Sequence, residues 1–145
     1  MKSILTRLLL AGAALLLPAS LWAQAEAPRL VLKGHDPVAY FTEGKPVKGD
    51  AQYSYDWDEG RYYFANARNR DQFKANPDRY APRFAGYCTG SMARGVRNEG
   101  NPEAWIIADG KLYVFGGIKY RDIAVKDRQQ LATWITDAGT NWAKR

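Results

Sequence analysis

The alternation of apolar and polar side chains along the chain predicts two β-hairpins. Aromatic residues dominate two runs, 52–57 and 61–65, which flank the short link Asp58-Glu59-Gly60. Two further apolar runs, 105–108 and 112–115, flank Asp109-Gly110, a pair that favours the type I′ turn between antiparallel strands. We therefore expect four strands, joined in two pairs.

Helical spacing of apolar residues and capping residues predict at least two helices. Asn66 can cap a helix over 67–75, which Asn76-Pro77 must end, and Pro77–Tyr80 can add one more turn. Asp127, with Gln130 three residues later, can begin a helix over about 127–142. That segment has an apolar face formed by Leu131, Trp134, Ile135, Ala138 and Trp142.

The remaining segments carry weaker signals. Pro37 keeps Asp36 out of helical geometry, so residues 35–41 are expected to form a turn that leads into a short strand. Residues 84–101 contain four glycines and are expected to form a loop. We find no internal repeat in the sequence. Two hairpins packed against two or more short helices, without a βαβ rhythm, indicate a small single α+β domain over 26–145.

The first 25 residues have the three parts of a secretory signal peptide. Lys2 and Arg7 supply positive charge, an uncharged run follows over 8–17, and Ala23-Gln24-Ala25 is a small-x-small cleavage site. The run is shorter than the about 20 apolar residues that a membrane anchor needs. We therefore expect Sec-type export and cleavage after residue 25. The mature protein would be periplasmic or secreted, with no membrane segment.

Charge and cysteine content narrow the classes of partner. The chain has 21 basic and 15 acidic residues. Two of the basic residues precede residue 26, which leaves 19 basic residues and a net charge of +4. The basic residues between 68 and 83 are interleaved with Asp71 and Asp78, as on a solvated helix face, so a nucleic-acid partner is not expected. The single cysteine, Cys88, cannot form an intramolecular disulfide, and the many aromatic residues are expected to build the core.

Several short motifs together resemble the YHS domain family, and in particular its exported bacterial members. They are Asp36-Pro37-Val38-Ala39-Tyr40-Phe41, Tyr62-Tyr63-Phe64-Ala65, Asn69-Arg70-Asp71-Gln72-Phe73, Tyr80-Ala81-Pro82, Gly86-Tyr87-Cys88, Pro102-Glu103-Ala104-Trp105 and Asp109-Gly110-Lys111-Leu112-Tyr113. The resemblance implies a family core over about 35–115. It also implies a relation to cysteine-bearing modules of metal-transporting ATPases. At the positions of those cysteines this chain has Ala39, Ala65 and Asn69, which are not ligands for soft metals.

Two kinds of chemistry are open at the cysteine. Cys88 and Met92 are four residues apart, and with His35 they would offer thiolate, thioether and imidazole ligands for copper or another soft metal ion. Alternatively, Cys88 could be the nucleophile of a thiol-dependent enzyme, activated by His35 or Arg94. Against both readings, a free cysteine is often buried, a methionine often fills gaps in a core, and His35 could simply brace a turn.

A non-enzymatic binding module is the function that we expect, because no catalytic constellation is present in the sequence. Its ligand, a small molecule or a periplasmic protein, would contact Tyr40, Tyr87, Cys88, Arg94 and Trp105. The aromatic members of this set could instead belong to the core. If the binding hypothesis holds, the folded protein should have a concave pocket along residues 86–95.

Overall fold

The structure is a computed structural model that describes residues 26–145, so the predicted signal peptide lies outside the described residues. The strands are β1 (Arg29–Leu30), β2 (Asp50–Trp57), β3 (Gly60–Phe64), β4 (Asn101–Ala108) and β5 (Lys111–Phe115). The helices are α1 (Ala39–Thr42), α2 (Ala67–Ala75), α3 (Pro77–Tyr80), α4 (Thr89–Met92), α5 (Ile118–Lys126) and α6 (Arg128–Trp142). In this part of the chain, no helix is long and apolar enough to cross a membrane.

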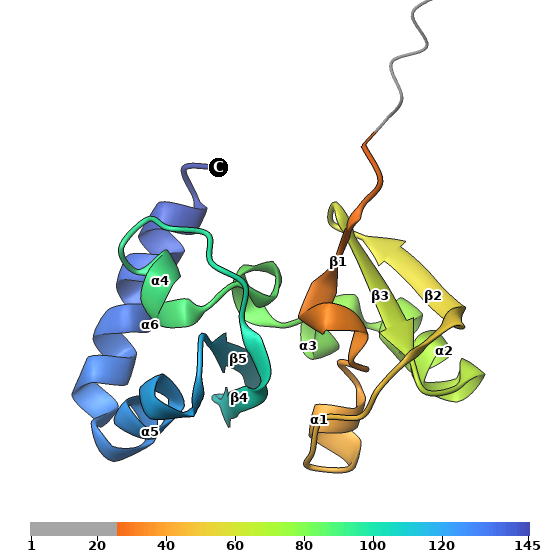
Figure 1. Cartoon of the computed structure of the whole chain (residues 1–145), viewed down its shortest axis with the longest axis horizontal. Helices are drawn as coiled ribbons and strands as arrows, with labels where there is room; N and C mark the ends of the chain where they lie inside the picture. The colour runs from red at the N-terminus through yellow and green to blue at the C-terminus, as the bar shows by residue number, and fades with distance from the viewer. Residues whose placement is uncertain (1–25) are drawn as a thin grey trace, which may run out of the picture.

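The elements form two lobes, which lie side by side in Figure 1. We call residues 29–80 the N-lobe and residues 83–145 the C-lobe. The N-lobe holds a three-stranded sheet in the order β1-β3-β2, with β1 parallel and β2 antiparallel to β3. The C-lobe holds the antiparallel pair β4-β5 with α5 and the long α6. The expected α+β class is confirmed.

The local signals with a defined stereochemistry are also confirmed. The Asn66 side chain accepts a hydrogen bond from the Asn69 N–H at 2.9 Å and so caps α2, and Asp127 caps α6 through the Gln130 N–H, also at 2.9 Å. At the tip of the second hairpin, Asp109 and Gly110 both have positive φ, 48° and 69°, as a type I′ turn requires.

Two expectations for the irregular segments were wrong. The segment after Pro37 is the short helix α1 and not a strand, because the Asp36 side chain accepts a hydrogen bond from the Val38 N–H at 2.8 Å and so starts a helical turn. The glycine-rich segment is not loop throughout, since it contains α4. Helix α5 had no counterpart among the expected elements. Its only buried residue is Ala124, and a pattern with so little apolar periodicity does not predict a helix.

The two lobes begin with the same backbone turn. In the turn Val31–Gly34, residues 32, 33 and 34 have φ of 53°, 50° and 79°, and in the turn Arg83–Gly86, residues 84, 85 and 86 have 55°, 49° and 77°. Each turn is followed by a single antiparallel bridge, His35 with Lys48 and Tyr87 with Glu99. A glycine beside each bridge donates back to its turn, Gly49 to the Gly34 carbonyl at 2.8 Å and Gly100 to the Gly86 carbonyl at 3.1 Å.

The correspondence continues through the hairpin and into the helix that follows it. Strands β4 and β5 repeat β2 and β3, with a register irregularity after the first residue pair in both, and α5 repeats α2. Asp50 and Asn101, at the starts of β2 and β4, each accept a hydrogen bond from the N–H two residues later, at 2.9 and 3.0 Å. The expectation that the chain has no internal repeat was therefore wrong for its structure. The repeated backbone is held by sequences with few identical residues.

Strand β5 joins the lobes into one domain because both of its faces are buried. Leu112 and Val114 pack into the core of the N-lobe, with Phe73 and Tyr62 at its centre. Tyr113 and Phe115 pack into the core of the C-lobe, against α5 and α6. A second junction lies at Tyr40, whose ring meets Trp105 edge-on at 5.1 Å and whose hydroxyl donates to the Pro102 carbonyl at 3.0 Å.

Candidate functional site

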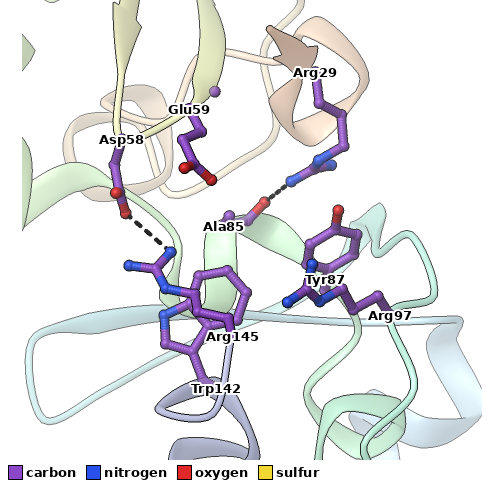
Figure 2. A pocket seen from close by; sticks show the side chains of 9 residues that line it. Arg29, Asp58, Glu59, Ala85, Tyr87, Arg97, Trp142 and Arg145 are labelled. Carbon is purple, nitrogen blue, oxygen red and sulfur yellow. Dashed lines mark hydrogen bonds and ion pairs between the residues drawn. The ribbon is translucent and has the colours of Figure 1, made fainter. Parts of the chain in front are cut away.

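A cleft of ≈ 480 Å³ lies where the two lobes meet (Figure 2). It draws on both lobes and on the last residue of the chain. Its lining is Arg29, Asp58, Glu59, Gly60, Ala85, Tyr87, Arg97, Trp142 and Arg145. Cavities at the junction of two structural units, of about 300–1,000 Å³, are common places for small ligands.

Each wall of the cleft has a defined backbone support. Asp58 and Glu59 form the tight turn between β2 and β3, where both have positive φ (46° and 66°). Ala85 belongs to the left-handed turn of the C-lobe, and Tyr87 stands in the bridge that follows it. Trp142 is the last residue of α6. The positions are thus fixed by turns, a bridge and a helix end.

Arg29 ties the N-lobe to the C-lobe along one side of the cleft. One guanidinium nitrogen is 2.8 Å from both carboxylate oxygens of Glu99, and another donates to the Ala85 carbonyl. The guanidinium also lies over the Tyr87 ring, 4.2 Å from its centroid. These contacts satisfy the cation and cover the tyrosine face.

Arg145 closes the opposite side. Its guanidinium lies 4.2 Å from the Trp142 ring centroid and 3.5 Å from an Asp58 carboxylate oxygen. Arg97 approaches the same ring at a longer distance, 5.8 Å. Within residues 26–145, neither Arg97 nor Glu59 has an ion pair or a side-chain hydrogen bond. Arg97 and Glu59 are therefore the two charged side chains of the cleft that remain available to pair with a ligand.

A second cavity, of ≈ 270 Å³, opens beside Cys88 in the C-lobe. It is lined by Cys88, Gly90, Ser91, Arg94, Asn98, Glu99, Gly116, Tyr120 and Trp134. The Cys88 side chain is 4% exposed, and its sulfur lies 3.6 Å from the place where a side chain on Gly116 would begin. The concave pocket expected along residues 86–95 is therefore present.

The predicted binding residues fall in three different places. Tyr87 lines the cleft, whereas Cys88 and Arg94 line the second cavity. Tyr40 is 1% exposed and packs against Trp105 at the junction of the lobes, which is a core position. Burial raises the pKa of the Tyr40 phenol well above its ordinary value, as expected of a core tyrosine.

The three candidate metal ligands are not arranged around one cavity. Met92 is buried in the core of the C-lobe, 2% exposed. His35 lies at the end of the N-lobe turn, where its Nδ1 is 3.0 Å from the Leu32 carbonyl, and it is not among the residues that line the Cys88 cavity. The described residues also contain no group of three His, Cys, Asp or Glu side chains that could hold a metal ion.

Sequence reasoning missed most of the cleft. No sequence pattern distinguishes Arg29, Arg97 and Arg145 from other charged residues. The sequence predicts Trp142 only as part of the apolar face of its helix. Arginine near aromatic residues is the signal that could have suggested them, but five separate segments supply the lining. Only the fold brings these segments together.

Comparison with known proteins supports the family expected from the sequence. Residues 38–84 match the family model of the YHS domain, which is 47 of the 145 residues. No curated protein and no solved structure matches the chain. The match begins before α1 and ends within the turn that opens the C-lobe, so it leaves nearly all of the second structural repeat unmatched. Residues 38–84 therefore hold a YHS domain, which covers most of the N-lobe.

Proposed function

We propose that this protein is an exported, non-enzymatic binding module that holds a small polar ligand in the cleft between its lobes. The observation that carries the proposal is the cleft itself, with a volume of ≈ 480 Å³ and guanidinium groups stacked on both of its aromatic residues. Stacked guanidinium groups are held in place before a ligand arrives. Such preorganisation reduces the entropy lost on binding.

Export is the second part of the proposal and rests on the sequence of residues 1–25. In the mature chain, Glu26 would be the first residue, three positions before Arg29 of the cleft. N-terminal sequencing of protein recovered from the periplasm of a bacterial host should begin at Glu26. A chain that keeps Met1 and stays in the cytoplasm would contradict this part.

The cleft is tested by native mass spectrometry of the full-length gene product after export in such a host. The wild-type protein should carry a bound small molecule, which unfolding releases for identification. Trp142→Ala, which removes the surface beneath two guanidinium groups, should carry none. Arg68→Gln, an exposed change on α2 away from the cleft, is the control and should retain the ligand. A ligand that survives Trp142→Ala would place binding elsewhere.

Thiol chemistry at Cys88 is a second candidate function, favoured by the open cavity that Cys88 shares with Arg94. A cation near a thiol favours the reactive thiolate. Reaction of the folded protein with a small maleimide at neutral pH should then be faster than reaction of free cysteine, and Arg94→Gln should slow it. Reaction slower than that of free cysteine would exclude this candidate.

A further inference from the structure

We infer that the ligand of the cleft is zwitterionic, with a carboxylate that binds Arg97 and an ammonium group that binds Glu59, as in a free amino acid or a short peptide. The inference rests on the proposed function, because it specifies the ligand of the same cleft.

Three arginines suggest an anion site at first sight, but internal ion pairs cancel most of their charge. Arg29 is paired with Glu99 through both carboxylate oxygens at 2.8 Å. Arg145 lies 3.5 Å from Asp58. One cation, Arg97, and one anion, Glu59, remain without an ion pair among the described residues. The cleft therefore presents one charge of each sign.

The two available groups belong to opposite lobes and both extend toward the cleft (Figure 2). Glu59 is held by the turn between β2 and β3, where its φ of 66° is one that a non-glycine residue adopts only when its surroundings fix it. Arg97 precedes Asn98, whose carbonyl accepts the Cys88 N–H at 2.8 Å and anchors the segment. A ligand that bridges Arg97 and Glu59 would thus also bridge the lobes.

Ligands of a single sign are disfavoured by the same arrangement. A polyanion such as a nucleotide would meet the carboxylates of Asp58, Glu59 and Glu99 around the cleft. A simple cation would meet three guanidinium groups. A dipolar ligand satisfies both available groups, and ≈ 480 Å³ lies toward the small end of the range for ligand pockets, about 300–1,000 Å³.

Calorimetric titration of the exported protein with three matched peptides tests the inference after any copurified ligand is removed by dialysis. Triglycine has both end charges, N-acetyltriglycine has only the carboxylate, and triglycine amide has only the ammonium group. Triglycine should bind at least roughly tenfold more tightly than either blocked peptide, because a charge-assisted contact is lost in each.

Two variants identify which end binds where. Arg97→Gln should abolish the preference for triglycine over triglycine amide, and Glu59→Gln should abolish the preference over N-acetyltriglycine. Arg68→Gln and Glu43→Gln, exposed changes outside the cleft, should alter neither preference.

The outcomes separate this inference from the proposed function. Equal binding of the three peptides, or a triglycine affinity unchanged by Glu59→Gln, would overturn the inference that the ligand is zwitterionic. The cleft would remain a binding site in that case if Trp142→Ala still removes the copurified ligand. If no peptide binds, the chemical identity of the copurified ligand tests the inference. A ligand that lacks either a carboxylate or an ammonium group would overturn it. Absence of both peptide binding and any copurified ligand contradicts the proposed function as well.

Discussion

The centres of the two lobes have the same backbone arrangement but different side chains, a hydrogen-bonded carboxyl group in the N-lobe and a thiol beside a cavity in the C-lobe. In the N-lobe, Asp36 is 0% exposed and accepts three hydrogen bonds, from the Val38 N–H at 2.8 Å, the Ala65 N–H at 2.9 Å and the Asn69 side chain at 2.7 Å. In the C-lobe the corresponding position is Cys88, and Gly116 and Tyr120 stand where Ala65 and Asn69 stand in the N-lobe. The N-lobe centre is filled, whereas the C-lobe keeps a cavity of ≈ 270 Å³.

The repeated backbone does not depend on the polar centre of the N-lobe. The left-handed turns, the bridges and the hairpins are present in both lobes, but the hydrogen-bonded carboxyl group is present in only one. Ala65 and Asn69, which by resemblance stand at cysteine positions of metal-bearing relatives, belong to this network in the N-lobe.

Removal of the Asp36 carboxyl group at the centre of the N-lobe should cause the largest loss of stability. Asp36→Ala leaves two backbone N–H groups and the Asn69 amide buried without an acceptor, so we expect the free energy of unfolding to fall by about 4 kcal/mol. Urea denaturation followed by tryptophan fluorescence measures it. A loss no larger than that of Cys88→Ala would break the contrast between the lobes.

The paired glycines beside the two bridges should respond alike. A side chain on Gly49 would begin 2.5 Å from the Tyr63 carbonyl carbon, and one on Gly100 would begin 2.5 Å from Val114 and 2.6 Å from the Gly86 carbonyl oxygen. We expect Gly49→Ala and Gly100→Ala each to cost about 2 kcal/mol in the same assay. Gly139→Ala, which meets nothing within 4 Å in helix α6, is the control and should cost nothing or raise the stability by up to about 1 kcal/mol. Unequal costs would show that the two turns are not equivalent.

Alkaline pH should weaken the N-lobe core first. Burial raises the pKa of Tyr40 and of Tyr62, and the pKa of Tyr113 in the C-lobe is also raised, mainly by burial. Since the folded state favours the protonated phenol, this stability is complete below the ordinary tyrosine pKa of about 10 and is lost as the pH rises past it. The loss per tyrosine should approach about 1.4 kcal/mol per pH unit.

Tyrosine-to-phenylalanine variants locate that loss. At pH 9, Tyr62→Phe should unfold at nearly the same urea concentration as the wild type. Between pH 10 and 11 it should lose less stability than the wild type. Tyr113→Phe should relieve less of the loss, because part of its ring is nearer to solvent. An identical alkaline profile for Tyr62→Phe would rule out this cause.

The smallest effect is expected at the C-lobe centre. The sulfur of Cys88 borders an existing cavity, so Cys88→Ala removes few packed atoms, and the expected loss is below about 1 kcal/mol. The urea midpoint measures it, with Met92→Ala as a fully packed comparison in the same lobe. A loss above that of Met92→Ala would mean that the cavity is not open around the thiol.

The sequence predicts those parts of the fold whose causes are local. The hairpin tips, the caps Asn66 and Asp127 and the end of α2 at Pro77 each depend on a few neighbouring residues. The repeat was not visible because it is maintained by backbone conformation. Identical residues at corresponding positions are scattered; they include Gly34 with Gly86, Gly49 with Gly100, Tyr62 and Phe64 with Tyr113 and Phe115, and Arg70-Asp71 with Arg121-Asp122.

The site was predictable only in part, for a different reason. Cys88 and Arg94 were found because they stand within one short glycine-rich segment, and the cavity lies beside that segment. The cleft depends on Arg29, Arg97 and Arg145, which are far apart in the chain and meet only after the lobes pack together. Long-range packing of this kind leaves no periodicity in the sequence.

Strand β5 sets how the molecule can come apart. Its alternate side chains, Leu112 and Val114 on one face and Tyr113 and Phe115 on the other, belong to different cores. We therefore expect that neither repeat folds on its own, even though each has its own turn, hairpin and helix. In hydrogen–deuterium exchange, the amides of β3 and β5 should show the same opening free energy after correction for their intrinsic exchange rates, because loss of β5 opens both cores in one event.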